Sequence, residues 1–250
     1  MKTLLSLSAL LITLTLTAQS QTANWYENDS AYGIQTQSCT ASGFFSIAMG
    51  RFTTASGDYS TAMGRDTTAS GDYSTAMGFQ TEASDRSSLV IGQYNLLGST
   101  VTNSATSFST SNTAFVIGNG TANDSRSDAL TVLFDGTTTI AGDLSINSDA
   151  RLKANIISLG STLAKLLQID GKTYTMKKDD NKKQKIGVLA QDIEKVFPEL
   201  VSESNGVKSV NYQGLVPVLI NALKEQDTKL NKQQAEIDKL KAIVTKLITP

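Results

Sequence analysis

The sequence predicts a mixed fold, with an N-terminal β region followed by an α+β region that ends in a long helix. Three observations predict it: a short repeat in the first half, a heptad pattern near the C-terminus, and a change of charge between them. Residues 1–147 hold 5 Lys and Arg against 11 Asp and Glu, whereas residues 148–250 hold 17 and 12. Because the two halves carry opposite net charge, we place a domain boundary at Ser148.

The first 20 residues have the pattern of a secretory signal peptide. Lys2 supplies a charged start, an apolar run of about 13 residues covers 4–16, and Ala18-Gln19-Ser20 offers a small-residue cleavage site. The run is too short to span about 30 Å of hydrocarbon. We expect an exported protein, secreted or held at the bacterial envelope, with no transmembrane segment in the mature chain.

Residues 21–96 form a predicted head with a repeat of 14 residues. Two small-residue motifs alternate in it, which predicts two short strands and two turns per coil. Alanine indicates a narrow interior, and we expect Ala, Met, Val and Ile to point into it. The first motif begins at Thr40, Thr54 and Thr68 and ends as Glu82-Ala83-Ser84-Asp85; the second begins at Ala48, Ala62 and Ala76 and ends as Val90-Ile91-Gly92.

The repeat resembles the head repeats of trimeric autotransporter adhesins over about four coils. The resemblance implies a left-handed parallel β-roll within a three-chain bundle. We interpret Asp58 and Asp72 as solvated turn residues rather than calcium ligands, because the glycine-rich nonapeptide of calcium-binding rolls is absent. Cys39 is the one cysteine, so it forms no disulfide within the chain. A small buried residue is the favoured reading, with a free thiol or an interchain link as alternatives.

Residues 97–147 form a predicted β-rich neck. Strand-like segments cover 114–118 and 129–134, Asp135-Gly136 is a turn signal, and 137–146 returns as a further strand pair. The segments hold few apolar residues for a lone chain. We therefore expect strands from several chains to share a core.

After Lys153 the pattern becomes mostly helical, and no cofactor motif accompanies it. A long helix over about 212–248 places Leu223, Leu230, Ile237 and Val244 at heptad position a, with Leu219, Gln226, Gln233, Leu240 and Leu247 at d. A coiled coil is favoured over an amphipathic helix folded on its own domain. The shorter predicted elements are a helix at 156–167, a hairpin of 172–176 with 185–189, a helix at 190–196 stopped by Pro198, a turn at Gly206 and a strand at 207–212.

Three motifs in this half resemble one family. They are Ser148-Asp149-Ala150-Arg151-Leu152-Lys153, the run from Gly187 to Val201, and Val210-Asn211-Tyr212 followed by Leu215 to Leu219. Together they resemble the intramolecular chaperone auto-processing domain at the C-terminus of endosialidases and phage tail spikes and fibres, over residues 148–250. The resemblance implies a Ser/Lys dyad of Ser148 and Lys153 and a cut at or next to the serine, which here is the Asn147–Ser148 bond.

The chemistry available to this chain is narrowed by its lack of histidine. Ser-His-Asp and Cys-His catalysis are excluded, and a metal site is not expected. A lysine must then activate the serine, and a lysine acts as a base near neutral pH only when it is desolvated or beside another cation. Arg151 is a candidate neighbouring cation but not a base. Asp149 either orients Lys153 or caps a following helix.

The spacing of the two residues imposes a condition. Residues five apart on a regular helix lie about 140° apart, so their side chains do not meet. The pair therefore requires a turn between the neck and the first helix, or a lysine from a neighbouring chain.

We therefore expect a secreted homotrimeric fibre or adhesin whose C-terminal domain drives assembly and then cuts itself off as a single-turnover serine peptidase. No substrate in trans, cofactor or nucleic-acid partner is expected, and the ligand of the head is unassigned. The alternative is a structural adhesin with an uncleaved trimerisation domain and an inert Ser/Lys pair. A carbohydrate-active enzyme is disfavoured, because the coils offer no paired carboxylates in a groove.

Overall fold

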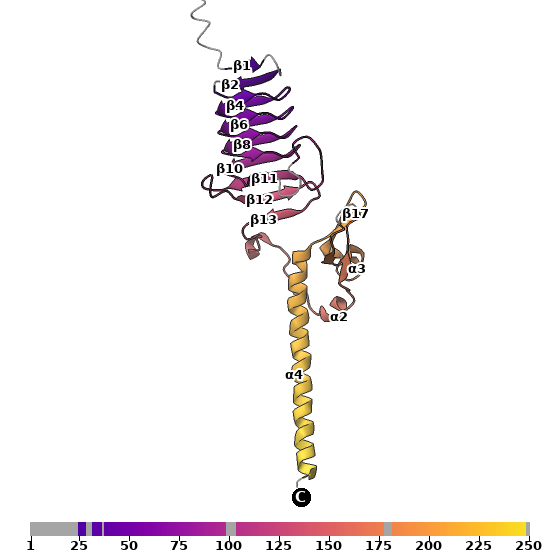
Figure 1. The fold of residues 1–250 in the computed structure, drawn as a ribbon. Helices are drawn as coiled ribbons and strands as arrows, with labels where there is room; N and C mark the ends of the chain where they lie inside the picture. The colour runs from indigo at the N-terminus through magenta and orange to yellow at the C-terminus, as the bar shows by residue number, and fades with distance from the viewer. Residues whose placement is uncertain (1–24, 29–31, 37, 99–103, 178–181, 249–250) are drawn as a thin grey trace, which may run out of the picture. The chain divides into compact units, whose positions relative to one another are not determined.

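The computed structural model describes residues 25–28, 32–36, 38–98, 104–177 and 182–248, so the predicted signal peptide lies outside the described residues. The chain divides into two compact units between Asn147 and Ser148. Figure 1 shows a stack of strands in the first unit and a long helix in the second.

The first unit is built on a β-solenoid of about four turns over residues 34–93. Each coil contributes one long and one short strand, and residues 14 apart, such as Ala48 and Ala62, are in register. The predicted fold class is thereby confirmed. The long strands are β2 (Gly33–Thr36), β4 (Ile47–Arg51), β6 (Thr61–Arg65), β8 (Thr75–Phe79) and β10 (Leu89–Gln93), and the short ones are β3 (Thr40–Ala41), β5 (Thr54–Ala55), β7 (Thr68–Ala69) and β9 (Glu82–Ala83).

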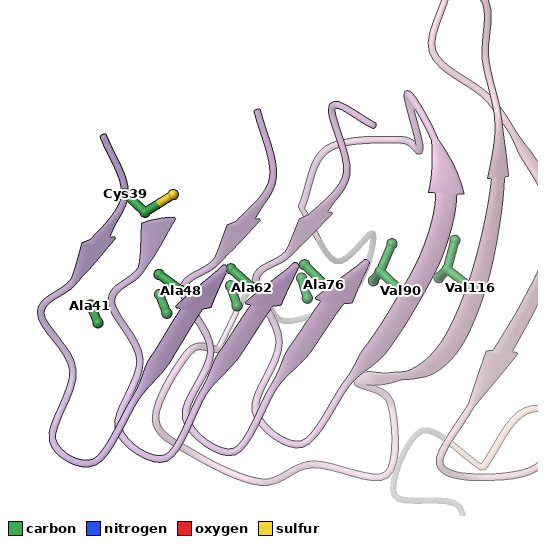
Figure 2. Packing of buried hydrophobic residues seen from close by; sticks show 10 residues of the cluster. Cys39, Ala41, Ala48, Ala62, Ala76, Val90 and Val116 are labelled. Atoms are coloured by element: carbon green, nitrogen blue, oxygen red, sulfur yellow. The ribbon is translucent and has the colours of Figure 1, made fainter. Parts of the chain in front are cut away.

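Alanine side chains fill the space between the two sheets. Ala48, Ala62 and Ala76 on the long strands are fully buried, as are their counterparts on the short strands. Figure 2 shows these methyl groups in a row that ends in Val90 and Val116. A core one alanine wide matches the narrow interior that the sequence predicts. Cys39 lies in the same cluster, 6% exposed, as a small buried residue.

The expectation that methionine and isoleucine also point inward is wrong. Neighbouring side chains on a strand point to opposite faces, so burial of Ala62 directs Met63 away from the core. Met77 is 38% exposed. The outward residues are in direct register across the long sheet and form an apolar ladder, which we call the outer strip; it consists of Met49, Met63, Met77, Ile91 and Ile117.

The coils stack so closely that one glycine column is obligatory. Gly50, Gly64 and Gly78 lie in register, with φ angles of 122°, 122° and 126°. A Cβ atom on Gly64 would lie 2.0 Å from the carbonyl oxygen of Gly78. Backbone conformation and backbone contact therefore both require glycine here.

The turn aspartates connect neighbouring coils. Asp58 Oδ1 accepts a hydrogen bond from Phe44 N at 2.8 Å, and Asp72 Oδ1 accepts one from Asp58 N at 3.1 Å. Asp72 also pairs with Arg86 at 3.4 Å. These contacts agree with the interpretation of both residues as turn residues.

The decay of the repeat marks the end of the solenoid. Asp85 occupies the position of Gly71 one coil later, and β9 is the last strand of the short sheet among the residues that the structure describes. Its Oδ2 accepts a hydrogen bond from Thr113 N at 2.8 Å. Asn95 takes the place of the next coil's backbone, since its side chain accepts from Glu82 N at 2.8 Å and donates to Glu82 O at 2.9 Å.

The neck extends the long sheet. β11 (Thr113–Asn119) runs parallel to β10, and β12 (Asp128–Leu133) and β13 (Thr138–Ile140) follow antiparallel. At the other end, β1 (Trp25–Asn28) pairs with β2. The strand pair expected over 137–146 is wrong beyond Ile140, because residues 143–149 form no regular structure.

The second unit is a small α+β assembly around Ile193, Val196, Phe197 and Val218. The hairpin and the helix stopped by Pro198 are confirmed. The helix expected over 156–167 is wrong in its first half, where Gly160 has a φ of 65°. The elements are α2 (Leu163–Leu166), β14 (Lys172–Tyr174), β15 (Lys185–Gly187), α3 (Ala190–Val196), η2 (Pro198–Leu200), β16 (Val201–Ser204), β17 (Val207–Val210), η3 (Tyr212–Gly214) and α4 (Leu215–Ile248).

Helix α4 uses two different faces. Only Val218 and Ala222 are buried among its described residues, and they lie near its start. The heptad residues face solvent, with Leu223 at 71% and Leu247 at 80% exposure. The long helix is confirmed, whereas the coiled coil requires other chains and stays a prediction.

Substituting Gly64 with alanine tests the backbone stacking. We expect Gly64→Ala to cost more than about 2 kcal/mol of stability, because it combines a forbidden φ with a clash. Gly142→Ala is the matched control, since nothing lies within 4 Å of its added Cβ. Its expected effect is within about 0.5 kcal/mol. Denaturant unfolding followed by far-UV circular dichroism measures both, and equal midpoints would contradict the stacking account.

Candidate active site

The Ser148–Lys153 motif folds into one tight turn. Ala150–Leu152 form the 3₁₀ helix η1, and Lys153 N closes it by donating to Ala150 O at 3.1 Å. Asp149 caps the turn, because its Oδ1 accepts a hydrogen bond from Arg151 N at 2.9 Å. The motif therefore departs from regular helix, as the spacing of Ser148 and Lys153 requires.

The turn brings together the two side chains that the sequence singles out. Lys153 Nζ donates a hydrogen bond to Ser148 Oγ at 2.7 Å. Both residues belong to the same chain and to the same compact unit. A neighbouring chain is thus not needed to supply the lysine.

Asp149 and Arg151 form a salt bridge with each other. Arg151 Nη2 lies 2.6 Å from Asp149 Oδ2, and Nε donates to both carboxylate oxygens at 3.1 Å. The Arg151 guanidinium holds the pKa of Asp149 below its ordinary value, and Asp149 raises the pKa of Arg151. Of the two roles considered for Asp149, the structure shows capping. Its carboxylate forms a fork with Arg151 rather than a hydrogen bond with Lys153.

The Ser/Lys pair lies open to water in the single chain. Ser148 and Lys153 are both exposed. The desolvation that a lysine base needs is therefore not supplied by the chain's own fold. Large apolar residues on both sides of the pair are also uncovered: Leu144 is 64%, Ile146 58%, Leu152 70%, Ile156 66% and Ile157 88% exposed.

A glutamate on α4 anchors the segment that follows the pair. Glu225 accepts hydrogen bonds from Ser161 Oγ at 2.6 Å, from Leu163 N at 3.1 Å and from Thr162 N. Nearby, Asn221 Nδ2 donates to Gly160 O at 3.1 Å. These contacts fix where α2 begins and explain why the helix does not extend back to Ile156.

Sequence reasoning missed Glu225, which looks like any other charged residue of a lysine-rich helix. The Ser161-Thr162 pair before an apolar segment is a helix-start signal. No sequence feature indicates which carboxylate accepts the hydrogen bonds of this pair.

The comparisons with known proteins bear out both resemblances drawn from the sequence. Residues 148–202 match the family model for the chaperone of endosialidase, a peptidase family, and residues 41–67 and 69–95 match two copies of the YadA head domain repeat. The chain is 31% identical over 112 residues to the long tail fiber protein Gp37 of Salmonella phage S16 and 29% identical over 100 residues to that of Escherichia phage AR1. The matches cover 41% and 36% of this chain but only 15% and 9% of those relatives.

Acidification tests the Glu225 anchor. The hydrogen bond from Ser161, followed by the backbone amides, lowers the pKa of Glu225 from 4.5. A lowered folded pKa contributes stability above the unfolded value, and this contribution is lost as the pH falls through the folded value. In the wild type, we therefore expect the melting temperature of the C-terminal unit to decrease as the pH is lowered past about 4.5.

Glu225→Gln should lower the melting temperature at neutral pH, because the charged hydrogen-bond acceptor is absent. It should also reduce the decline of the melting temperature in acid, because the group that becomes protonated is absent. Glu236→Gln on the exposed part of α4 is the matched control. Parallel pH profiles for wild type and Glu225→Gln would contradict the assignment.

Proposed function

We propose that this chain is one subunit of a homotrimeric, fibre-like surface protein whose C-terminal unit drives assembly and then cuts the Asn147–Ser148 bond. The contact between Lys153 Nζ and Ser148 Oγ at 2.7 Å carries this proposal. It lies at the start of the segment that matches the chaperone of endosialidase. The tail fiber relatives and the head repeats support the fibre-like architecture.

The reaction uses the serine as nucleophile and the lysine as base. Neutral Lys153 takes the proton of Ser148 Oγ, and Oγ attacks the carbonyl carbon of Asn147. The C–N bond breaks, Lys153 returns the proton to the leaving nitrogen, and an ester joins Asn147 to Ser148 Oγ. A second nucleophile then attacks the ester carbonyl, the C–Oγ bond breaks, and residues 148–250 are released with a free Ser148 hydroxyl. The nucleophile is already next to its target, so a single turnover needs no encounter with a substrate.

Assembly of the trimer would supply the desolvation of Lys153 that the single chain lacks. A lysine in water is protonated at neutral pH and is no base. Desolvation favours the neutral amine. The exposed apolar residues near the pair in the sequence, Ile146, Leu152 and Ile157 among them, would provide a cover when neighbouring subunits pack together. Cleavage would thus follow correct trimer formation.

Two further surfaces support a trimer. The outer strip faces away from the alanine core, and the heptad residues of α4 are exposed along its length. Both are mostly apolar and regularly spaced; in the described chain the outer strip is only partly buried and the heptad residues are exposed. Packing against identical copies buries them in register. Across the part of the chain that the structure describes, none of the helices has the length and apolar character needed to cross a membrane. Export through the signal peptide belongs to the proposal.

An uncleaved adhesin remains the second candidate. The exposure of Ser148 and Lys153 favours it, because a pair that stays solvated in the trimer is inert. In that case the C-terminal unit is a permanent trimerisation foot.

A denaturing gel distinguishes the two functions. We expect the folded wild-type chain to release a fragment of residues 148–250, and Ser148→Ala and Lys153→Met to abolish release, because each removes one half of the pair. Ser204→Ala, at another exposed serine of the same unit, is the matched control and should be cut normally. An intact wild-type trimer would favour the adhesin function.

A charge in the outer strip tests the trimer interface. Met63→Asp should convert trimers to monomers in light scattering, because each subunit would bury an unpaired carboxylate at a cost of several kcal/mol. Ser56→Asp, which adds the same charge at an exposed turn, should leave the trimer intact. Trimers of unchanged stability with Met63→Asp would place the interface elsewhere.

A further inference from the structure

The residue on the acyl side of the proposed cleavage bond is an asparagine with a free side chain. Asn147 is exposed and lies in the irregular segment 143–149. Its side-chain amide has no hydrogen-bond partner within the described part of the chain. The amide can therefore turn toward the carbonyl carbon of its own residue. Attack of Nδ2 on that carbon closes a five-membered imide ring.

If the Ser/Lys pair is covered in the trimer, the ester must be resolved without access to bulk water, and closure of this ring does so. An apolar cover that takes water away from the Lys153 amine would also exclude the water needed to hydrolyse the ester. The nearest carboxylate in the motif, Asp149, is held by Arg151 through both of its oxygens and is not available to activate water. A nucleophile that already belongs to the acyl residue needs neither water nor a second base.

We propose that Asn147 resolves the ester by cyclising. This step rests on the proposed function, because it acts on the ester that Ser148 forms. Nδ2 of Asn147 attacks the ester carbonyl, the Nδ2–C bond forms, and the C–Oγ bond breaks. One proton leaves Nδ2 and reaches Ser148 Oγ through Lys153, which lies 2.7 Å from that oxygen. No water is consumed.

The products define the reaction. The fibre ends in a succinimide at residue 147, and the released unit begins with a serine that carries a free amine and a free hydroxyl. Later hydrolysis of the ring adds one water at either carbonyl. It yields a C-terminal asparagine or its isomer with the carboxyl and amide groups exchanged.

Mass spectrometry of the wild-type chain tests the step directly. Samples are quenched in acid during cleavage, and the C-terminal peptide of the fibre fragment is measured. We expect a mass one water below that of the hydrolysed peptide. On standing at neutral pH, this species should convert into two chromatographically separate peptides of equal mass.

Variants at Asn147 provide the kinetic test. Asn147→Ala cannot cyclise, so release should slow by at least about tenfold and the ester should accumulate. The ester is detected as full-length chain that hydroxylamine cuts after denaturation. Asn147→Gln, which would require a larger ring, should also be slow. Ser145→Ala in the same segment should cleave at the wild-type rate.

The outcomes separate this step from the function on which it rests. Cleavage that gives only the hydrolysed asparagine in acid-quenched wild type, with Asn147→Ala at the wild-type rate, overturns the cyclisation and leaves self-cleavage standing. A wild-type trimer that is never cut overturns both.

Discussion

The hydrogen bond between Lys153 Nζ and Ser148 Oγ is the contact on which the account of this protein depends. It exists because a three-residue turn replaces the first turn of a regular helix. That turn is held by Asp149, whose carboxylate caps the backbone and fixes the Arg151 side chain at the same time. The charged neighbours are thereby paired with each other, and the lysine is left to contact the serine.

A second constraint connects this contact to the rest of the chain. The solenoid is only one alanine wide, so each coil buries little surface. In the single chain its outer strip is only partly buried, and the heptad face of α4 is exposed. The large apolar residues that flank Ser148 in the sequence are exposed as well. Assembly of several copies would bury all of these surfaces together. The same event would take water from the amine and link the chemistry to the completed fibre.

Much of the fold could be predicted from the sequence, because the repeat has a simple physical basis. Alanine every 14 residues predicts a narrow core, and the structure confirms it. The prediction that the methionines point inward is wrong, because adjacent side chains on a strand point to opposite faces. Asp85 has the place of a repeat glycine in the sequence, yet its side chain, together with that of Asn95, makes hydrogen bonds to backbone amides where the short sheet ends.

The contact between Ser148 and Lys153 was a prediction from the motif, whereas its surroundings were not predictable. The spacing of Ser148 and Lys153 indicates that a turn is needed, but it does not indicate that the Asp149 side chain caps this turn. The anchor at Glu225 joins residues more than 60 positions apart, and no local pattern encodes such a contact. The pair is exposed in the single chain, and such exposure depends on how the whole chain packs, which the local sequence does not display.

Chemical rescue tests the central claim most directly. Lys153→Ala trimers, left uncut, are incubated with small primary amines, and release of the C-terminal unit is followed over time. The account predicts that amines restore cleavage and that Ser148→Ala trimers do not respond. Cleavage of Lys153→Ala at the wild-type rate without any amine would contradict it.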